Sequence, residues 1–281
     1  MQTVLINGVA SEYVSVTDRG LHYGDGLFET IACVGRHAIF IEQHLQRMAS
    51  AARLLDIVFP DRDLILHDID SLLHDSTDSK SVIKLLLTRG RGKRGYRYEA
   101  GQIPLRVCMR SPWPAYVAQW WQHGIKTRFC QTQASINPDL SGIKSLNRLE
   151  NVLASRELGS DYDEGFLCDN DGHVIEGTMS NLFTVIDNTL VTPDLSRSGI
   201  RGIMREQVIA CAHDAGIGVE IVRLTRDDLM RSQELFVSNS VIGICGVKQL
   251  EQQGFHKNTM TELIRTQLEN RIDADAKTVA Y

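Results

Sequence analysis

The sequence predicts an α+β protein with two domains. A chain of 281 residues is too long for one small core and fits two domains of ordinary size. Its first part contains predicted strands together with two predicted helices, which is an α+β pattern. Two prolines in Ser111-Pro-Trp-Pro114 then interrupt any regular element. We therefore expect an N-terminal domain over residues 1–112, a linker over 113–117 and a C-terminal domain over 118–281.

The N-terminal part shows two predicted hairpins, two helices and two further strands. Asn7-Gly8 is typical of a tight turn between strands at 3–6 and 9–16. The later elements are expected at 28–33, 36–41, 42–56, 61–74, 81–88 and 103–110. Two of these, 42–56 and 61–74, have apolar residues at helical spacing. The apolar positions are Leu45, Met48, Ala52 and Leu55 in the first helix and Leu64, Ile65, Ile69, Leu72 and Leu73 in the second.

The C-terminal part contains seven predicted strands and four predicted helices. The strands are expected at 125–133, 164–168, 173–177, 181–186, 189–192, 217–222 and 234–238. The helices are expected at 146–158, 202–215, 225–231 and 258–270. In the first of these helices we expect Leu149, Val152 and Leu153 to form a buried apolar face.

Composition excludes several classes of function. The hydrophobic content of 43% and charged content of 23% are those of a soluble globular protein, and the net charge of −5 disfavours nucleic acid and acidic membranes. No apolar run approaches the length of a membrane span, and we expect no signal peptide. The six cysteines are scattered, so we expect buried thiols in a cytoplasmic protein. The nine histidines have no metal-like spacing, and we assign no metal.

A basic segment stands out between two predicted strands. Thr88-Arg-Gly-Arg-Gly-Lys-Arg-Gly-Tyr-Arg-Tyr98, called here the basic loop, contains five cations, three glycines and two tyrosines. Arginines and aromatic rings suit nucleic acid, but the segment is short and the chain is acidic. A flexible solvated loop would have the same composition. We favour a loop that binds an anionic small molecule.

Three further features carry possible chemistry. Lys144 precedes a predicted buried helix, and a partly desolvated amine loses proton affinity and becomes a nucleophile. Glu176 lies inside the predicted strand 173–177, where a buried carboxylate needs a compensating cation. The run Gly199-Ile-Arg-Gly202 leads into a predicted helix, whose first N–H groups suit a phosphate. Taken singly, the lysine could be an ordinary surface residue and the glycine run an ordinary loop.

Together these features match the requirements of pyridoxal 5′-phosphate (PLP). A lysine amine binds its aldehyde, and backbone amides bind its phosphate. A carboxylate keeps the ring nitrogen protonated, so that the ring accepts electrons. The ring cation would also explain why Glu176 can be buried.

Three motifs resemble those of the fold-type IV PLP enzymes. They are Lys144-Ser-Leu-Asn-Arg-Leu-Glu150, Val174-Ile-Glu-Gly-Thr-Met-Ser-Asn-Leu-Phe183 and Gly199-Ile-Arg-Gly-Ile-Met-Arg205. This family includes branched-chain and D-amino acid aminotransferases and 4-amino-4-deoxychorismate lyase. The likeness extends from Leu5-Ile-Asn-Gly8 to about residue 250. It implies an α+β N-terminal domain, a pseudo-barrel C-terminal domain, a cofactor between them and a homodimer.

The resemblance also implies roles for individual residues. Lys144 matches the lysine that binds the cofactor covalently, and Glu176 matches the partner of the pyridine nitrogen. The positions that match phosphate-binding residues of the family are Arg47 by its side chain, Ile200 and Arg201 by their backbone amides, and Ser240 in place of a threonine.

Two segments are most similar to the lyases of this family, Arg89-Gly-Arg-Gly-Lys-Arg-Gly-Tyr96 and Gly142-Ile-Lys-Ser-Leu-Asn-Arg-Leu-Glu150. The implied reaction converts 4-amino-4-deoxychorismate to 4-aminobenzoate and pyruvate, a step of folate synthesis. Glu29 stands where aminotransferases often have glutamate, which leaves an aminotransferase of D- or branched-chain amino acids open.

The expected substrate carries two carboxylates, for which planar guanidinium groups are suited. Arg91, Arg94 and Arg148 are the candidates, although Arg148 could equally pair with Glu150. Tyr96 is expected to pack against the substrate ring or to anchor the basic loop. Either Thr30 or Lys144 could deliver the proton to the departing pyruvate.

Overall fold

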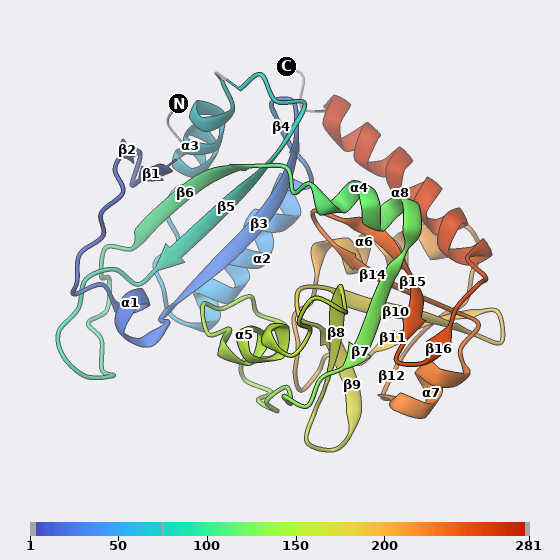
Figure 1. Cartoon of the computed structure of the whole chain (residues 1–281). Helices are drawn as coiled ribbons and strands as arrows, with labels where there is room; N and C mark the ends of the chain where they lie inside the picture. Colours follow the sequence, from blue (N-terminus) through green and yellow to red (C-terminus); the bar gives the residue numbers. More distant parts are fainter. Residues whose placement is uncertain (1–3, 75, 279–281) are drawn as a thin grey trace. The chain divides into compact units, whose positions relative to one another are not determined.

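The computed structural model describes residues 4–74 and 76–278, which form eight helices and two sheets (Figure 1). The chain divides into two compact units. Unit 1 comprises the described residues of Met1–Trp113, Ile143–Asn147 and Ile272–Tyr281, and unit 2 comprises Pro114–Gly142 and Arg148–Arg271. A short internal stretch around Lys144 therefore belongs with the N-terminal residues.

Unit 1 is built on a six-stranded antiparallel sheet with the order β2-β1-β6-β5-β3-β4. The strands are β1 Val4–Ile6, β2 Val9–Ala10, β3 Gly26–Val34, β4 His37–Ala38, β5 Lys80–Thr88 and β6 Leu105–Pro112. The helices are α1 Arg19–Tyr23, α2 Ile41–Leu54 and α3 Arg62–His74. Strands β3 and β5 pair over their whole length, from Gly26 opposite Thr88 to Val34 opposite Lys80.

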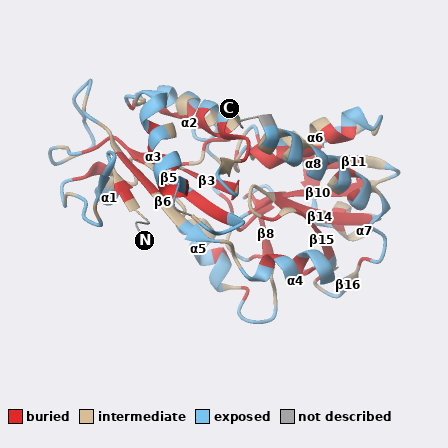
Figure 2. Cartoon of the chain, turned by 90° about the horizontal axis from the view of Figure 1, so that it is seen from above, coloured by how far each residue is buried: buried red, intermediate tan, exposed pale blue. Residues whose placement is uncertain are grey.

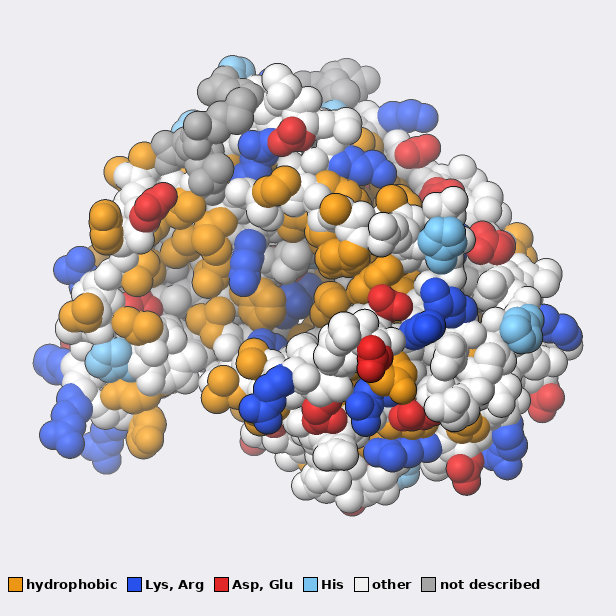
Figure 3. Space-filling view, in the orientation of Figure 1, with side chains coloured by type: hydrophobic (Ala, Val, Ile, Leu, Met, Phe, Trp, Pro, Cys, Tyr) orange, Lys and Arg blue, Asp and Glu red, His pale blue; other side chains and the backbone are white. Residues whose placement is uncertain are grey.

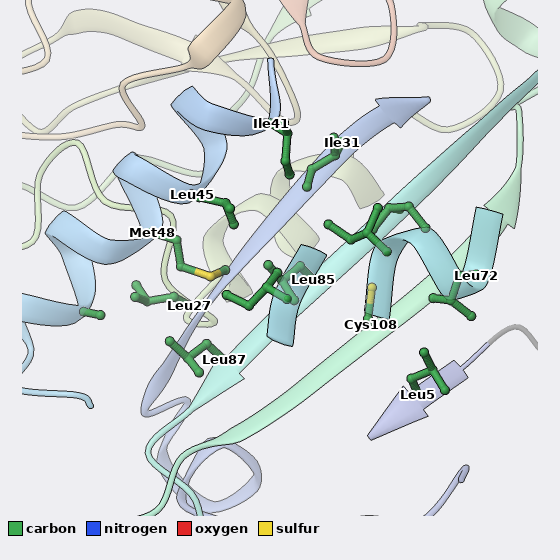
Figure 4. Close-up of a cluster of buried hydrophobic side chains, with 14 of the residues drawn as sticks. Leu5, Leu27, Ile31, Ile41, Leu45, Met48, Leu72, Leu85, Leu87 and Cys108 are labelled. Atoms are coloured by element: carbon green, nitrogen blue, oxygen red, sulfur yellow. The ribbon is translucent and has the colours of Figure 1, made fainter. Parts of the chain in front are cut away.

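One face of this sheet carries the core of unit 1. Alternate residues of a strand point to opposite faces, and Leu27, Ile31 and Leu85 on one face pack against Leu45 and Met48 of α2 (Figure 4). Helix α3 covers the same face, because its buried residues belong to the same cluster. Complete burial of such side chains contributes about 1.5–3 kcal/mol each. The other face of β3 and β5 is thereby left for other contacts.

Unit 2 is built on a ten-stranded mixed sheet with the order β12-β11-β10-β14-β15-β7-β8-β9-β13, to which β16 adds at β15. Its strands are β7 Ile125–Phe129, β8 Glu164–Cys168, β9 His173–Gly177, β10 Asn181–Ile186, β11 Thr189–Pro193, β12 Val219–Val222, β13 Leu224–Thr225, β14 Glu234–Asn239, β15 Gly243–Leu250 and β16 Gln253–Gly254. The helices are α4 Tyr116–His123, α5 Leu149–Arg156, α6 Ile203–Asp214, α7 Arg226–Arg231 and α8 Thr259–Thr278, whose last residues count with unit 1.

The central strands of unit 2 are buried on both faces (Figure 2). Their sequences accordingly read as continuous apolar runs rather than as alternating ones. Phe183 of β10 and Phe236 of β14 stack with centroids 5.1 Å apart and planes 10° apart, and both are fully buried. No helix in the described ranges 4–74 and 76–278 is long and apolar enough to cross a membrane.

Most predicted elements are present, but two expectations were wrong, namely the burial of the apolar face of α5 and the length of the second hairpin strand, and some elements were not predicted. Leu149, Val152 and Leu153 are 77%, 61% and 45% exposed, so α5 turns its apolar face to solvent. Leu64 of α3 is also exposed. The second strand of the first hairpin is only Val9–Ala10. Helices α1 and α4 and the long strand β15 were not predicted, because short helices and a run broken by Gly243 and Gly246 give weak periodicity.

All six cysteines are buried and unpaired. Burial raises the pKa of the Cys33 and Cys130 thiols to about 12. Thiols with such a pKa are inert at neutral pH, since the thiolate is the nucleophile. The prediction of buried cysteines is confirmed.

Candidate functional site

Lys144 is held by the first residues of β3. The N–H of Phe28 donates to the Lys144 carbonyl at 3.0 Å, and the N–H of Leu146 donates to the Gly26 carbonyl at 3.0 Å. Leu27 and Ser145 form an isolated antiparallel bridge. These bonds make the lysine segment a short extra strand of the unit 1 sheet. The Lys144 Nζ lies 4.3 Å from the centroid of the Phe28 ring, a cation–π arrangement.

The alternation along β3 separates two groups of residues. Phe28 and Thr30 share one face, which Lys144 also faces, and both are half-buried. Glu29 points to the opposite face, where it is 1% exposed. There the His44 Nδ1 lies 2.6 Å from Glu29 Oε2, and the Arg47 Nε donates to Oε1 at 2.8 Å. Glu29 therefore belongs to the core side of the sheet.

The Glu29 carboxylate is stabilised by the two side chains beside it, His44 and Arg47. Burial by itself raises the pKa of a carboxyl group, but the charges and hydrogen bonds of His44 and Arg47 outweigh this effect and bring the Glu29 pKa to about 2. Arg47, the residue matched to phosphate binding, is thus fixed by two nitrogens, with Nη2 2.5 Å from Oε2. Its side chain is 13% exposed.

Glu176 of β9 is 6% exposed, as its position inside the predicted strand 173–177 suggested. Its Oε2 accepts the Ile200 N–H at 2.7 Å. Gly199 has φ +83°, and a Cβ at that position would lie 2.8 Å from side-chain carbons of Ile175 and Leu195 and 3.2 Å from Oε2 of Glu176. A glycine is therefore needed for the backbone to approach the carboxylate so closely.

A second buried carboxylate, Glu164 of β8, supports the turn that follows Glu176. Its Oε1 accepts the Thr178 Oγ1 at 2.5 Å and the Thr178 N–H at 2.9 Å, and its Oε2 accepts the Ser180 Oγ at 2.7 Å. Burial raises the Glu164 pKa, and these hydrogen bonds offset part of the rise. The small polar run after Glu176 thus satisfies Glu164. A lone acid in the apolar run Glu-Gly-Phe-Leu-Cys168 was the signal that sequence reasoning missed.

The two amides expected to bind phosphate have partners in the structure. The Ile200 N–H donates to Glu176, and the Arg201 N–H donates to the Gly142 carbonyl at 3.1 Å. A phosphate at these amides would have to share or replace these bonds. Gly202 is the N-cap of α6 and has no side chain to cap the helix, so the first turn of α6 also presents N–H groups. Ser240 follows β14 and is half-buried.

The basic loop is anchored by Asp25. The Asp25 carboxylate accepts the Arg19 Nε at 2.8 Å and the Arg89 Nε and Nη2 at 2.8 and 3.0 Å. Arg19 in turn donates to the carbonyls of Gly95 at 2.9 Å and Tyr96 at 3.0 Å. Burial would raise the Asp25 pKa, but the hydrogen bonds from Arg89 and Arg19 hold it below its usual value. The loop therefore has a defined backbone and is not simply a solvated segment.

Aromatic contacts complete this anchor. The Tyr23 hydroxyl accepts the Gly95 N–H at 2.9 Å, and the Tyr23 and Tyr96 rings lie 5.4 Å apart. The Arg89 guanidinium lies 3.7 Å from the centroid of Tyr98. Arg19, Tyr23 and Asp25 were not among the expected site residues, because their partners lie some 70 residues away in the sequence.

The remaining side chains of the basic loop point outward. Arg91, Lys93, Arg94 and Arg97 are exposed, and Tyr96 is 85% exposed. Figure 3 shows Lys and Arg side chains gathered where this loop lies after β5. Arg89 thus has a structural role, and Lys93 pairs with Glu99 at 2.6 Å. The exposed side chains of Arg91 and Arg94 are accessible to an anionic ligand.

Arg148 precedes α5 and is half-buried, and its carbonyl accepts the Val152 N–H at 3.0 Å. Glu150, its suggested partner, accepts the Ser135 N–H at 3.0 Å and also the Ser135 hydroxyl. The carboxylate of Glu150 therefore fastens α5 to the segment before Lys144. These hydrogen bonds account for the Glu150 carboxylate without a role in binding or catalysis.

One cluster in the described residues resembles a metal site in composition. The ligand atoms of Asp169, Asp171 and His173 lie within 4.8 Å of one another. The Asp169 Oδ1 accepts the N–H groups of Asp171 and His173 at 3.0 and 2.9 Å, and Arg197 pairs with Asp171 at 2.8 Å. These acids stabilise the β8–β9 hairpin turn, so we assign no metal to them.

Comparison with known proteins shows the family to which the chain belongs. Residues 26–250 match the family described as amino-transferase class IV. The chain belongs to this family. One similar protein is an aminodeoxychorismate lyase of Vibrio harveyi, which is 33% identical over 86% of this chain and 89% of its own length. Another is a putative branched-chain-amino-acid aminotransferase of Methanocaldococcus jannaschii, which is 31% identical over 90% of this chain and 88% of its own length.

The fold also matches a solved class IV structure. The 4-amino-4-deoxychorismate lyase of Pseudomonas aeruginosa superposes with a TM-score of 0.90 and 37% identity, over 96% of this chain and 99% of that one. The branched-chain aminotransferase of Escherichia coli superposes with a TM-score of 0.87 at 24% identity, which shows a common fold. The prediction of an α+β, fold-type IV protein is confirmed.

Proposed function

We propose that this protein is a PLP-dependent lyase that converts 4-amino-4-deoxychorismate to 4-aminobenzoate and pyruvate. The observation that carries the proposal is the likeness to two lyases over almost their whole length, at 33% and 37% identity. The anchored basic loop supports it, because the loop presents arginines and a tyrosine to a ligand with two carboxylates and a ring. The products contain all the atoms of the substrate, so the reaction needs no water and no second substrate.

The residues present fit PLP. Lys144 supplies an amine on the open face of β3, next to an aromatic ring. Glu176 supplies a buried carboxylate for the pyridine nitrogen, and Gly199 allows the backbone to come close to it. For the phosphate we propose Arg47, the amides of Ile200 and Arg201, the first turn of α6 and Ser240. This donor set matches the aldehyde, ring nitrogen and phosphate of the cofactor.

When bound, PLP accepts electrons from the carbon that carries the substrate amine. Glu176 keeps the ring nitrogen protonated, which makes this acceptance possible. Lys144, once released by the substrate amine, removes the proton from that carbon. Loss of the neighbouring enolpyruvyl oxygen then leaves an aromatic ring. Thr30, on the same face of β3 as Phe28, or Lys144 itself returns a proton to the departing pyruvate.

The substrate carboxylates need cations outside the cofactor set. Arg94 and Arg91 of the basic loop are our proposed ligands, with Arg148 as a third, because a guanidinium binds a carboxylate with two hydrogen bonds. Tyr96 anchors the loop against Tyr23 and lies beside these arginines. The Asp25 anchor keeps the loop backbone in place while its outer side chains bind.

An aminotransferase of D- or branched-chain amino acids is the second candidate, favoured by the 31% identical relative from M. jannaschii. Glu29 does not support it specifically. The structure gives this residue a structural task on the core side of β3, where it pairs with His44 and Arg47. Glutamate at this position is therefore useful whichever reaction the protein catalyses.

The test combines covalent trapping with an activity assay. Holoprotein reduced with borohydride should carry a pyridoxyl group on Lys144, seen by mass spectrometry, and should form fluorescent 4-aminobenzoate before reduction. Lys144→Ala should lose both properties, while Lys257→Ala, a change at an exposed lysine, should keep both. Rapid glutamate formation from 2-oxoglutarate and D-alanine or valine, without aminobenzoate, would favour the aminotransferase instead.

We further propose a homodimer in the cytoplasm. Exposed apolar side chains gather in unit 1 at Val9, Tyr13, Val14, Val16 and Leu21, and in unit 2 along α5. Apolar surface of this kind usually marks an interaction site. The six buried thiols suit a reducing compartment. Light scattering of the purified protein gives the mass, and a monomer at micromolar concentration would refute the dimer.

A further inference from the structure

Lys84 lies on the same face of the unit 1 sheet as the cofactor lysine. It stands opposite Thr30 in the β3–β5 pairing, and partners of an antiparallel pair point to the same face. Its Nζ lies 5.5 Å from the centroid of Phe28, and the Lys144 Nζ lies 4.3 Å from the same centroid, so at most about 10 Å separates the two nitrogens. Sequence reasoning missed Lys84 because it occupies an ordinary-looking strand.

Lys84 adds a positive charge to this face of the sheet. Lys84 is exposed, and no carboxylate of the described residues forms an ion pair with it. The residues around it are Phe28, Thr30 and Leu86, which carry no negative charge. Two ammonium groups on one face of a sheet both attract an anion that lies between them. The face is therefore suited to a ligand that carries a carboxylate.

Given the proposed function, on which this inference rests, the spacing fits one particular group. In the substrate the ring carboxylate lies opposite the amine-bearing carbon, with its oxygens roughly 5 Å from that carbon. A proton-accepting amine stands about 3–3.5 Å from the carbon it attacks. A charge-assisted N–H···O bond adds about 2.8 Å. These three lengths, joined at an angle, fit within the distance of at most about 10 Å between the Lys144 and Lys84 nitrogens.

We propose that Lys84 binds the ring carboxylate of the substrate, the one that the product 4-aminobenzoate retains. Lys84 is thus a specificity-determining residue for a para-carboxylated ring. The arginines of the basic loop then remain for the second carboxylate, on the enolpyruvyl group. D-Alanine or valine held at Lys144 has no carboxylate at this distance, so Lys84 favours the larger substrate over these amino acids.

The experiment measures binding of two matched ligands to holoenzyme by calorimetry. 4-Aminobenzoate carries the charge and 4-aminobenzamide does not. Lys84→Met should weaken 4-aminobenzoate roughly tenfold and leave 4-aminobenzamide unchanged, since one partly exposed charge-assisted bond is lost. Lys84→Arg should restore most of the affinity. The Michaelis constant for the substrate should rise with little change in kcat.

Lys80→Met is the matched control. Lys80 lies on the same strand and face, about 13 Å away along β5, with its Nζ over the Trp113 ring at 5.3 Å. It should leave both affinities unchanged. Equal affinity of Lys84→Met and wild type for 4-aminobenzoate would overturn the inference, as would a wild type that binds the amide as tightly as the acid. A kcat that falls with a shifted pH profile and an unchanged affinity would also overturn it.

Different results would refute the proposed lyase function and the proposed role of Lys84. Wild type that forms no 4-aminobenzoate refutes the lyase function itself. Wild type that forms it, with Lys84→Met binding the product normally, refutes only the role of Lys84.

Discussion

The buried carboxylate of Glu29 gives a sharp prediction about stability. We consider Glu29→Gln, which keeps the shape of the side chain and removes its charge. In the wild type the carboxylate is 1% exposed and contacts both His44 and Arg47. The variant removes the negative charge beside His44 and Arg47 on the core side of the unit 1 sheet. Loss of one partner of a buried ion pair is strongly destabilising.

The size of the effect follows from the Glu29 pKa. It falls from 4.5 to about 2 on folding, and each unit corresponds to about 1.4 kcal/mol. The ionised carboxylate therefore contributes on the order of 3 kcal/mol to the free energy of unfolding at pH 7. Because the folded pKa is depressed, this contribution is complete above pH 4.5 and is lost as the pH falls towards 2. At pH 3 less than half of this contribution should remain.

The assay is urea unfolding followed by circular dichroism at pH 7, 5, 4 and 3. The difference between wild type and Glu29→Gln should be constant from pH 7 to 5 and shrink below that, since a protonated carboxyl resembles an amide. Glu42→Gln is the control, because Glu42 pairs with Arg62 at the surface, where both side chains are about half exposed. It should cost less than about 0.5 kcal/mol.

Two results would refute this reasoning. One is equal stability of Glu29→Gln and wild type at pH 7. The other is a difference that stays the same between pH 7 and pH 3, because it would show that shape and not charge sets the cost.

Three other perturbations address the site. Asp25→Asn should loosen the basic loop, seen as faster tryptic cleavage there, and raise the Michaelis constant roughly tenfold; an unchanged cleavage rate would remove Asp25 from its anchoring role. Glu164→Ala should destabilise the protein by about 3 kcal/mol or more, since Thr178 and Ser180 lose a shared acceptor, and Glu164→Gln by less; equal losses would argue against the hydrogen bonds. Arg47→Met should speed PLP loss in dialysis, measured by absorbance, and unaltered retention would contradict its phosphate role.

Much of the fold could be predicted from local sequence patterns. Strands 164–168, 173–177 and 181–186 were predicted with their exact limits, because each is short, rich in β-branched or aromatic residues and bounded by turn residues. The buried state of Glu176 followed from the same pattern. The side on which a helix is buried could not be predicted in this way. The apolar face of α5 has regular spacing, yet it is exposed, because no other element of the described chain packs on it.

The sequence by itself determined the class IV motifs, with the lysine and the carboxylate that we propose for the cofactor, since these depend on residue types at short spacing. Only the tertiary structure decided which residues meet across long separations in the chain. Asp25 meets Arg89, Glu164 meets Thr178 and Lys84 shares the Phe28 ring with Lys144. These contacts arise from strand register and loop closure, and a charged residue gives no local sign of the partner that folding will bring to it.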